Sequence, residues 1–420
     1  MIIGVIGSGG REHALCAKLI ESKKIKKLYC FPGNAGTSAI AENININIDN
    51  FKNLKDFVIE NKIDFLVVGP EKPLVDGIVD YFDKYNIKIF GPNKIASQLE
   101  GSKIFTKKIC EKYKIPTAKF KIINKIQQAE VFLESAIFPL VVKADGLAAG
   151  KGVYICENKK ESIYAVKEIF NGKFGKAKEI LIEEFLKGEE MSYFIISDGF
   201  TFKKFETAQD HKRVFEGDKG KNTGGMGAYS PSSIINKNLD EKIINKIIKP
   251  TLNSLKDMKT NFKGFLYAGL MIVNNEPYLI EYNVRMGDPE CQTILPRLKT
   301  NLADIFNACL QSKLSSIDIE WHENKSLCIV VCSKGYPDKY INNVLLKNIN
   351  KINLNKTEFI YHAGTKMNGG KIYSNGGRVL NFTVLSKEFK SARDNAIKII
   401  EKLDWPNGFF RKDIGYKVIK

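Results

Sequence analysis

The sequence lacks any long apolar run, and this absence limits what the chain can be. No segment of its 420 residues approaches the roughly 18 consecutive apolar residues that a membrane-spanning helix needs. Residues 1–6 are apolar apart from Gly4, but no basic segment precedes them and the polar residues 7–12 end the run. We therefore expect no membrane partner, no secretory signal and a cytoplasmic location.

The sequence also lacks any C-x-x-C pair, although it contains eight cysteines. Such pairs are typical of zinc sites and of redox-active dithiols. Cys328 and Cys332 are near each other in sequence, but they lie in an apolar segment that is typical of a strand. In a long chain without a secretory signal, we expect buried, reduced thiols rather than disulfides or a zinc site.

Acidic residues are too few to balance the basic ones. The chain has 65 Lys and Arg against 47 Asp and Glu, a formal net charge of +18. A nucleic-acid partner is one explanation for such an excess. However, the lysines are spread along the chain in pairs such as Lys23-Lys24 and Lys159-Lys160, and they form no single basic tract. We therefore expect most of them on the solvated surface and no nucleic-acid partner.

The first ninety residues alternate between short apolar segments and helical patterns. This alternation predicts a parallel sheet with crossover helices, in which ligands bind beyond the carboxyl ends of the strands. The predicted strands are 1–6, 26–31, 63–70 and 87–92. The loops expected at the ligand-binding edge are 7–11, 32–37, 69–74 and 91–92.

The rest of the chain reads differently. One helix is predicted from Lys94 to Tyr113. Two apolar strands, 265–273 and 277–284, are joined by Asn274-Asn275-Glu276, which indicates a hairpin. The segment from residue 326 onward has the pattern of a small α+β domain.

The first glycine-rich loop, GSGGR at 7–11, does not fit a dinucleotide-binding fingerprint. Gly7 and Gly9 match G-x-G-x-x-G, but Glu12 occupies the third glycine position, and the second strand carries no carboxylate for a ribose. A glycine-rich turn into a helix N-terminus still offers N–H groups to an anion, and Arg11 adds a charged donor. A tight turn with no ligand is an equally good interpretation.

A second glycine-rich loop lies in VVKADGLAAGKGVYI at 141–155. It is no Walker A loop, because Lys151 is followed by Gly152 and a strand rather than by Ser or Thr and a helix. The pattern predicts a flap between antiparallel strands that closes over phosphate groups. Lys143 precedes the flap on its first strand, where its ammonium group reaches toward phosphate oxygens.

The strand PYLIEYNV carries a carboxylate and an amide at its end. Glu281 and Asn283 lie two residues apart, so they share a face, and alternation places Leu279 and Arg285 on that same face. A carboxylate with an amide oxygen suits Mg²⁺ held together with substrate phosphates. The alternative is an exposed strand on which Glu281 and Arg285 form an ion pair.

Taken in order, the strand lysine, the flap, the acidic segment LIEEFLKGEE and the E-x-N pair resemble the ATP-grasp ligases. Longer motifs narrow the resemblance to the phosphoribosylamine–glycine ligase family, and they cover nearly the whole chain. These motifs are GSGGREHAL, PGNAGT, VKADGLAAGKGV, QDHKR, NTGGMGAYSP, HAGT, GGRVL and RKDIG.

The resemblance implies a multidomain protein of mixed α/β and α+β class. Its four expected parts are an N-terminal Rossmann-like substrate domain at 1–102, a main ATP-grasp body at 103–118 and 189–325, a flap subdomain at 119–188, and a C-terminal α+β domain at 326–420.

The resemblance also implies an activity, which is the ATP-dependent ligation of glycine to 5-phosphoribosylamine through glycyl phosphate, with ADP and phosphate as products. Mg²⁺ or Mn²⁺ would bind Glu281 and Asn283, and Arg285 and Lys143 would act in catalysis. The expected partners are these small molecules alone, for a monomeric enzyme. No cysteine is needed as a nucleophile.

The remaining site residues follow from the same resemblance. The residues expected to bind ATP are Lys103, Lys143, Gly150, Lys151, Gly152, Glu183, Glu184, Phe185, Leu186 and Glu190. The residues expected to bind the other substrates are Gly9, Gly10, Arg11, Glu71, Asp210, Lys212, Asn222, Thr223, Gly224, Gly225 and Arg285.

Three points stay open at the level of sequence. Another ATP-grasp carboxylate–amine ligase or carboxylase is the nearest rival function. Strand 265–273 has no acidic residue, so the ligands of a second metal ion are undefined. Asp210 and Lys212 could equally form a structural ion pair.

Overall fold

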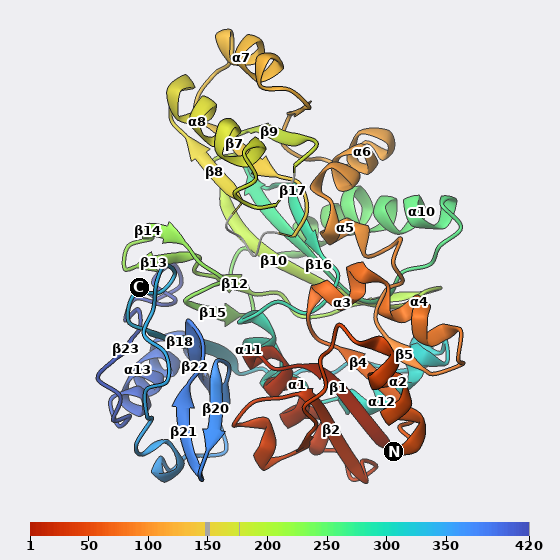
Figure 1. Cartoon of the computed structure of the whole chain (residues 1–420), viewed down its shortest axis with the longest axis vertical. Coiled ribbons are helices and arrows are strands. Elements are labelled where there is room, and N and C mark those ends of the chain that lie inside the picture. Colours follow the sequence, from red (N-terminus) through yellow and green to blue (C-terminus); the bar gives the residue numbers. More distant parts are fainter. Residues whose placement is uncertain (148–151, 176, 420) are drawn as a thin grey trace.

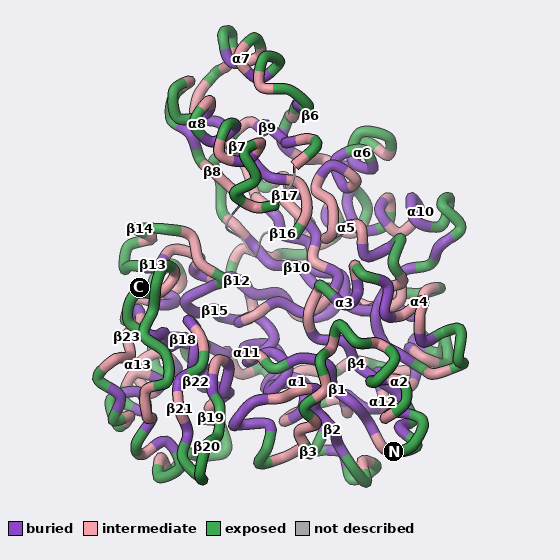
Figure 2. Tube along the Cα trace, viewed as in Figure 1, coloured by how far each residue is buried: buried purple, intermediate pink, exposed green. Residues whose placement is uncertain are grey.

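The computed structural model describes residues 1–147, 152–175 and 177–419 (Figure 1). The N-terminal sheet lies beside the C-terminal sheet, a central sheet lies above both, and a small flap sheet projects at the far end. Figure 2 shows that the strands are mostly buried, whereas the exposed residues gather on loops and outer helix faces. Within the described residues, no helix has both the length and the apolar composition needed to cross a membrane.

The N-terminal sheet is parallel, as predicted, with strand order β3-β2-β1-β4-β5. Its inner strands are mostly apolar, as expected for a parallel sheet that is covered on both faces. The strands are β1 (Ile2–Gly7), β2 (Lys27–Pro32), β3 (Glu42–Asn43), β4 (Phe65–Val68) and β5 (Ile89–Phe90). The helices are α1 (Gly10–Ile20), the short η1 (Thr37–Ala39), α2 (Phe51–Glu60), α3 (Glu71–Asp76) and α4 (Ile78–Asp83).

The predicted helix from Lys94 to Tyr113 is wrong, because the chain forms two helices, α5 (Gln98–Gly101) and α6 (Lys103–Tyr113). Ser102 separates them with an extended backbone (φ −142°), and its hydroxyl caps α6 by accepting the N–H of Phe105. The same hydroxyl donates to the carboxylate of Asp145 at 3.0 Å. This break makes Lys103 the first residue of α6.

The flap sheet is antiparallel, with strand order β6-β9-β7-β8, and has a hydrophobic core of its own. The predicted pairing of the two strands that flank the flap is confirmed, with Lys143 opposite Val153. The strands are β6 (Phe120–Ile123), β7 (Leu140–Ala144), β8 (Val153–Cys156) and β9 (Ile180–Glu184), and the helices are α7 (Ile126–Glu134) and α8 (Lys159–Phe170).

The central sheet has strand order β11-β10-β16-β17. The predicted hairpin is confirmed, because Asn274 and Asn275 both adopt a left-handed conformation (φ 49° and 61°) in the turn between β16 and β17. The strands are β10 (Glu189–Asp198), β11 (Phe202–Lys204), β16 (Lys263–Val273) and β17 (Glu276–Asn283). Helices α9 (Lys237–Ile243), η2 (Ile244–Ile248) and α10 (Lys249–Asp257) precede β16.

A β-bulge in this hairpin corrects one expectation about strand faces. Glu281 pairs with Gly269, but Leu279 pairs with Leu270, so the register shifts by one residue between the two pairs. Because directly paired residues share a face, Leu279 lies on the core face and not with Glu281 and Asn283. Leu279 is accordingly 1% exposed.

The C-terminal sheet includes strands from the middle of the chain. Strands β12 (Gln209–Asp210) and β15 (Gly227–Ser230) join β18 (Lys325–Ser333), β22 (Arg378–Ser386) and β19 (Glu358–His362), and β23 (Gly408–Phe409) pairs with β18. The predicted boundary between 325 and 326 stays a prediction, although this hydrogen-bonded sheet crosses it. The hairpin of β13 (Arg213–Phe215) and β14 (Lys219–Asn222) lies between β12 and β15.

The other elements complete the packing around this sheet. They are α11 (Glu290–Ile294), η3 (Leu295–Arg297), α12 (Leu302–Leu310), η4 (Leu314–Ser316), η5 (Ile349–Lys351), the hairpin of β20 (Thr365–Asn368) and β21 (Lys371–Ser374), and α13 (Phe389–Ile400). All eight cysteines are buried and free, as expected.

Candidate active site

A cleft of about 830 Å³ is lined by residues from the N-terminal, flap, central and C-terminal sheets. It brings together most of the residues that the sequence predicts for a site. These are Gly9, Arg11, Glu71, Lys103, Lys143, Gly152, Glu183, Glu184, Phe185, Leu186, Glu190, Asp210, Lys212, Asn222, Thr223, Gly224, Glu281, Asn283 and Arg285.

Four predicted residues are not part of this lining. Gly150 and Lys151 lie outside the described residues. A Cβ on Gly10 would lie 2.4 Å from Asn381 Nδ2, and one on Gly225 (φ +112°) would lie 2.6 Å from Pro289 Cδ. Gly10 and Gly225 therefore allow close packing beneath the cleft, which explains why these positions are glycine.

On the flap side, two lysines hold one buried glutamate. Glu183 Oε2 lies 2.8 Å from Lys143 Nζ, and Glu183 Oε1 lies 3.1 Å from Lys107 Nζ. Burial alone would raise the pKa of Glu183, but the two ammonium groups outweigh it and hold that pKa below its usual range. Glu183 thus orients Lys143 within the cleft.

Lys103 reaches the same region from the start of α6. Its Nζ donates to the carbonyl oxygen of Gly146 at 3.0 Å. Burial lowers the pKa of Lys103, while the nearby Glu281 opposes this shift. The lysine, the flap strand and the E-x-N pair therefore face one another, which is the arrangement that the sequence predicts.

Arg285 forms no ion pair with Glu281, so that alternative is wrong. The guanidinium of Arg285 pairs with Glu71 (Nε–Oε2, 3.1 Å) and with Glu100 (Nη2–Oε1, 2.8 Å), and it donates to Asn283 Oδ1 at 3.1 Å. Arg285 lowers the pKa of Glu71 to about 2, whereas burial raises the pKa of Glu100. The side-chain carboxylate of Glu281 forms no hydrogen bond or ion pair with any described residue.

Lys212 pairs with Glu190 and not with Asp210, so the structural pair considered for Asp210 is absent from the described residues. Lys212 Nζ lies 2.7 Å from Glu190 Oε2, and this contact lowers the pKa of Glu190. Burial raises the pKa of Asp210 to about 7 despite the nearby Lys212, and Glu290 and Glu190 add to the rise.

The loop before α1 is already capped by acidic side chains. Glu12 accepts the N–H of Gly9 at 2.6 Å and pairs with Arg11 Nε at 2.7 Å, while Asp288 Oδ2 lies 3.4 Å from the N–H of Arg11. The chain itself thus supplies negative charge at this helix N-terminus. An external anion here would meet fewer free donors than the sequence suggests.

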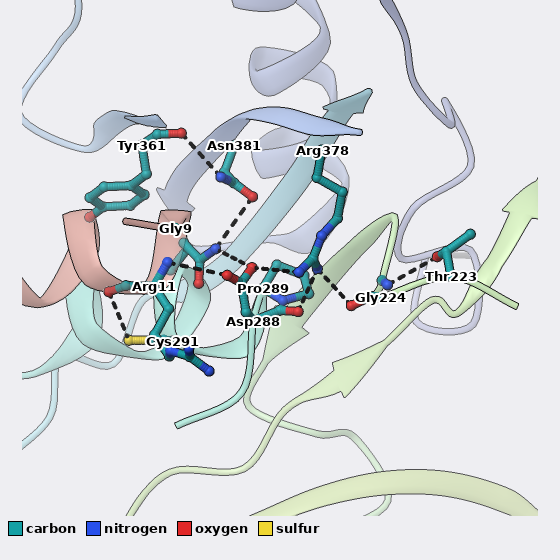
Figure 3. A network of polar contacts seen from close by, with 12 residues as sticks. Gly9, Arg11, Thr223, Gly224, Asp288, Pro289, Cys291, Tyr361, Arg378 and Asn381 are labelled. Atoms are coloured by element: carbon teal, nitrogen blue, oxygen red, sulfur yellow. Dashed lines mark hydrogen bonds and ion pairs between the residues drawn. The ribbon is translucent and has the colours of Figure 1, made fainter. Parts of the chain in front are cut away.

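Figure 3 shows how Arg378 links three distant segments at the edge of the cleft. Its Nη1 donates to the carbonyl oxygens of Gly224 and Asp288, each at 2.6 Å, and its Nη2 lies 3.4 Å from Asp288 Oδ1. Asp288 in turn contacts Arg11 of the N-terminal loop. One C-terminal guanidinium therefore ties together the loops at 7–11, 222–225 and 286–289.

Sequence reasoning missed several residues of the cleft. Lys107 follows Lys103 by four residues on a helix, so helical spacing alone could have placed both on one face. Arg378 stands in the quoted GGRVL motif and Glu290 lies seven residues after Asn283 of the E-x-N strand, yet nothing local shows that they reach the cleft. The residues missed are Glu100, Lys107, Asp288, Glu290 and Arg378.

Comparisons with known proteins agree with this geometry. Three family models match the chain: phosphoribosylglycinamide synthetase N domain at residues 1–100, its ATP-grasp (A) domain at 101–291 and its C domain at 326–417. A phosphoribosylamine–glycine ligase of Caldanaerobacter subterraneus is 44% identical over 99% of both chains. One of Mesorhizobium japonicum is 44% identical over 100% of this chain and 99% of its own.

Solved structures extend the similarity to the fold. The crystal structure of a phosphoribosylamine–glycine ligase from Thermotoga maritima has a TM-score of 0.87 and 29% identity, and covers 99% of this chain and 100% of its own. A biotin carboxylase from Campylobacter jejuni, solved as an ATP-analogue complex, has a TM-score of 0.73 at 14% identity, over 96% of this chain and 91% of its own. The latter likeness concerns the fold alone.

Proposed function

The chain belongs to the phosphoribosylglycinamide synthetase family, and on this premise we propose how its cleft carries out the ligation. It is an ADP-forming phosphoribosylamine–glycine ligase of purine synthesis. It joins glycine to 5-phosphoribosylamine and converts ATP to ADP and phosphate. The observation that carries our assignment of roles is that the Glu281 carboxylate, which has no partner among the described residues, faces Lys103 beside the flap.

The chemistry requires that glycine be activated first. An amine does not displace oxide from a carboxylate at a useful rate. An oxygen of the glycine carboxylate therefore attacks the γ-phosphorus of ATP, which releases ADP and forms glycyl phosphate. The amine of phosphoribosylamine then attacks the glycyl carbonyl, and phosphate leaves. The protein contributes mainly alignment and charge neutralisation.

We place ATP on the flap side of the cleft. The backbone at 183–186, at the end of β9 and in the segment that follows it, would contact the adenine, and Glu190 would accept hydrogen bonds from the ribose hydroxyls. Lys103 and Lys143 would neutralise phosphate oxygens, with Lys143 held in place by Glu183. Gly152 at the end of the flap would close over the phosphates, exclude water and so protect an acyl phosphate that hydrolyses readily.

Mg²⁺ or Mn²⁺ fits the pair formed by Glu281 and Asn283. Both oxygens of Glu281 lack partners among the described residues, and a hard cation prefers carboxylate and amide oxygens. No group of three or more acidic, His or Cys side chains in the described chain could hold a metal alone. The ion would therefore also need phosphate oxygens. When bound, it would neutralise negative charge on the phosphates.

Arg285 is suited to the transferring phosphoryl group. Its guanidinium is fixed by Glu71 and Glu100, so it needs little reorganisation when negative charge develops. Its position next to Asn283 would set it beside the metal and the γ-phosphate.

We place phosphoribosylamine on the opposite side, between the N-terminal loop and the loop at 222–224. Gly9 and Arg11, which the resemblance gives as substrate-binding residues, would face its 5-phosphate, and Arg378 adds a second guanidinium at the same edge. Since Glu12 and Asp288 already cap the α1 terminus, we assign the larger share of phosphate binding to the two arginine side chains.

The test is ADP release with ATP, Mg²⁺, glycine and phosphoribosylamine generated in situ, omitting one component at a time. The expected result is ADP only when glycine and the amine are both present. ADP formed with bicarbonate or another carboxylate in place of glycine would contradict the substrate assignment.

A further inference from the structure

The motif RKDIG at 411–415 lies outside the cleft lining, yet it is tightly bonded to the rest of the chain. Its first residue, Arg411, is charged but only 1% exposed. The guanidinium of Arg411 donates to the carboxylates of Asp413 and Asp218, each at 2.8 Å. It also donates to the carbonyl oxygen of Arg213 at 2.9 Å. A buried guanidinium with this many partners holds the segments that it joins in one relative position.

The C-terminal segment, residues 411–417, holds the hairpin of β13 and β14. These two strands form a sheet of their own and pair with no other strand of the described chain. The hairpin is fixed instead by the C-terminal segment, in which Asp413 Oδ2 accepts the N–H of Gly217 at 2.8 Å. Tyr416 Oη donates to Asp218 Oδ2 at the same distance. Figure 1 shows the hairpin beside the C-terminal end of the chain.

The C-terminal segment also holds His211, which stands between Asp210 and Lys212 of the cleft lining. The backbone of His211 continues the pairing of β12 with β15 through hydrogen bonds of 2.9 and 2.8 Å. The chain is therefore extended here, and successive side chains point to opposite sides. The imidazole of His211 is 1% exposed, and its Nε2 accepts the N–H of Gly415 at 3.0 Å. This contact fixes the strand that carries Lys212.

The hydrogen bond to Gly415 requires a neutral imidazole. Burial lowers the pKa of His211, although Asp218, whose Oδ1 lies 3.7 Å from Nδ1, opposes the shift. The ring is therefore neutral at pH 7, and because Nε2 accepts a hydrogen bond, the proton lies on Nδ1 and faces Asp218. Asp218 thus contacts His211, Arg411 and Tyr416, and it joins the hairpin to the C-terminal segment.

On the cleft side, Lys212 holds one oxygen of Glu190. Lys212 Nζ lies 2.7 Å from Glu190 Oε2, whereas Oε1 accepts no hydrogen bond from the described residues. Lys417 also lines the cleft, and the charges of Lys212 and then Lys417 lower the pKa of Glu190 against the effect of burial. Glu190 therefore has one oxygen fixed by the chain and one oxygen open to a donor such as a hydroxyl group. The C-terminal segment reaches this point through both His211 and Lys417.

We propose that the C-terminal segment, through His211, positions the Lys212–Glu190 pair to receive the ribose hydroxyl groups of the nucleotide. His211 is a positioning residue, because its imidazole faces Gly415 and not the cleft. The proposal rests on the assignment of Glu190 to the ribose in the function proposed above, and it adds the residues that hold Glu190 in place. It gives a part of the C domain a role in nucleotide recognition.

The test compares ATP with 2′,3′-dideoxy-ATP, which lacks both hydroxyl groups that Glu190 would bind. The dissociation constants of both nucleotides are measured with Mg²⁺ by calorimetry, without glycine or the amine. In the wild type, the loss of hydrogen bonds to a carboxylate predicts about tenfold to a hundredfold weaker binding of the dideoxy nucleotide. His211→Met removes the acceptor for Gly415 and should weaken the binding of ATP alone. The two constants should then lie within about threefold of each other.

Two further variants of the same region and one control separate this role from a general effect on folding. His211→Gln places an amide oxygen near the position of Nε2, so it should keep the hydrogen bond to Gly415 and restore the difference between the nucleotides. Tyr416→Phe removes only the hydrogen bond to Asp218 and should reduce that difference by about threefold. His322→Met, at an exposed histidine outside the cleft lining, is the control and should leave both constants unchanged.

Equal weakening of both nucleotides by His211→Met, or an unchanged difference between them, would overturn the proposal. If that variant does not fold, as judged by thermal unfolding, Tyr416→Phe decides, and an unchanged difference there would overturn the proposal. A wild type that binds both nucleotides equally would also overturn it, because Glu190 would then not hold the ribose. Calorimetry does not depend on ligation, so a failure of the ligase function is recognised separately, by the absence of glycine-dependent ADP release.

Discussion

The two sides of the cleft balance their charges in opposite ways. On the flap side, Lys107 and Lys143 pair with Glu183, and Lys103 donates to the carbonyl oxygen of Gly146, which leaves positive charge in excess. On the central-sheet side, Asp210, Glu281 and Glu290 lack protein cations within the described residues, which leaves negative charge in excess. The first side suits a triphosphate, and the second suits a cationic ligand such as a metal ion. The triphosphate therefore compensates the excess positive charge on the flap side, and the cationic ligand compensates the excess negative charge on the central-sheet side.

This difference also predicts which substitutions affect folding stability and which affect activity. Glu183 and Arg285 sit in buried ion pairs, so removing one partner leaves a buried charge uncompensated and destabilises the fold. The carboxylates of Glu281 and Asp210 form no ion pair with any residue that the structure describes. Their substitution should therefore affect turnover and ligand binding far more than folding.

Glu281→Gln should have the largest effect on activity. It removes the carboxylate expected to hold the metal, so kcat should fall by about a thousandfold or more. Thermal unfolding should show little loss of stability, because the Glu281 carboxylate forms no hydrogen bond or ion pair with the residues that the structure describes. A variant that retains activity within about tenfold of the wild type would contradict its role.

Lys143→Met should have the second-largest effect on activity. Loss of a preorganised cation at the phosphates predicts a fall in kcat/KM for ATP of roughly a hundredfold to a thousandfold. The matched control is Lys159→Met on α8, which removes an exposed ion pair with Glu134 of α7, beside the flap sheet. Equal effects of the two variants on ATP kinetics would show that flap stability, and not phosphate binding, is being measured.

Arg378→Ala tests the edge of the cleft at which we place phosphoribosylamine. It should raise the KM for phosphoribosylamine by about tenfold to a hundredfold and leave the KM for ATP unchanged. Arg393→Ala, on α13 outside the cleft lining, serves as the control. If the KM for ATP rises instead, the 5-phosphate has been placed on the wrong side.

The smallest effect concerns pH. Because the pKa of Asp210 is raised to about 7, its carboxylate ionises as pH rises through neutrality. The KM for glycine should fall about tenfold between pH 6 and pH 8, and Asp210→Asn should abolish this dependence. A pH-independent KM for glycine in the wild type would contradict the expected role of Asp210 in substrate binding.

The ionisation of Asp210 should lower the stability of the folded, ligand-free chain as pH rises, whereas it should favour glycine binding. In the unfolded chain Asp210 ionises near its ordinary value of 3.8, but the folded, ligand-free chain resists ionisation up to about pH 7. The stability that this group contributes is present below the pKa that Asp210 has in the unfolded chain. It is lost as pH rises through the pKa that Asp210 has in the folded chain. Melting curves of the wild type and Asp210→Asn should therefore differ less at pH 4 than at pH 8.

Sequence patterns predicted the structural features that depend on residues close together in the chain. The parallel N-terminal strands, the strands that flank the flap, the Asn274-Asn275 turn and the shared face of Glu281 and Asn283 all follow from local periodicity. The break at Ser102 and the bulge that turns Leu279 into the core depend on tertiary contacts instead. A single-sequence pattern does not contain them.

The site residues that sequence reasoning missed also depend on tertiary contacts. Arg378 and Glu290 reach the cleft only because the C-terminal sheet incorporates β12 and β15 from the middle of the chain. That pairing joins Tyr229 to Leu327, about a hundred residues later in the sequence. Family resemblance supplied Asp210 and Lys212 as substrate residues, but only the structure reveals which of them has an ion-pair partner.

The most direct test of the account follows the oxygen atoms of glycine. With glycine labelled by oxygen-18 in its carboxylate, the attack on the γ-phosphorus transfers one labelled oxygen to the phosphate released. Mass spectrometry of that phosphate should therefore find one oxygen-18 atom per molecule formed, in step with glycinamide ribonucleotide. Phosphate without label, released alongside product, would show that glycine is not activated as glycyl phosphate and would contradict the mechanism.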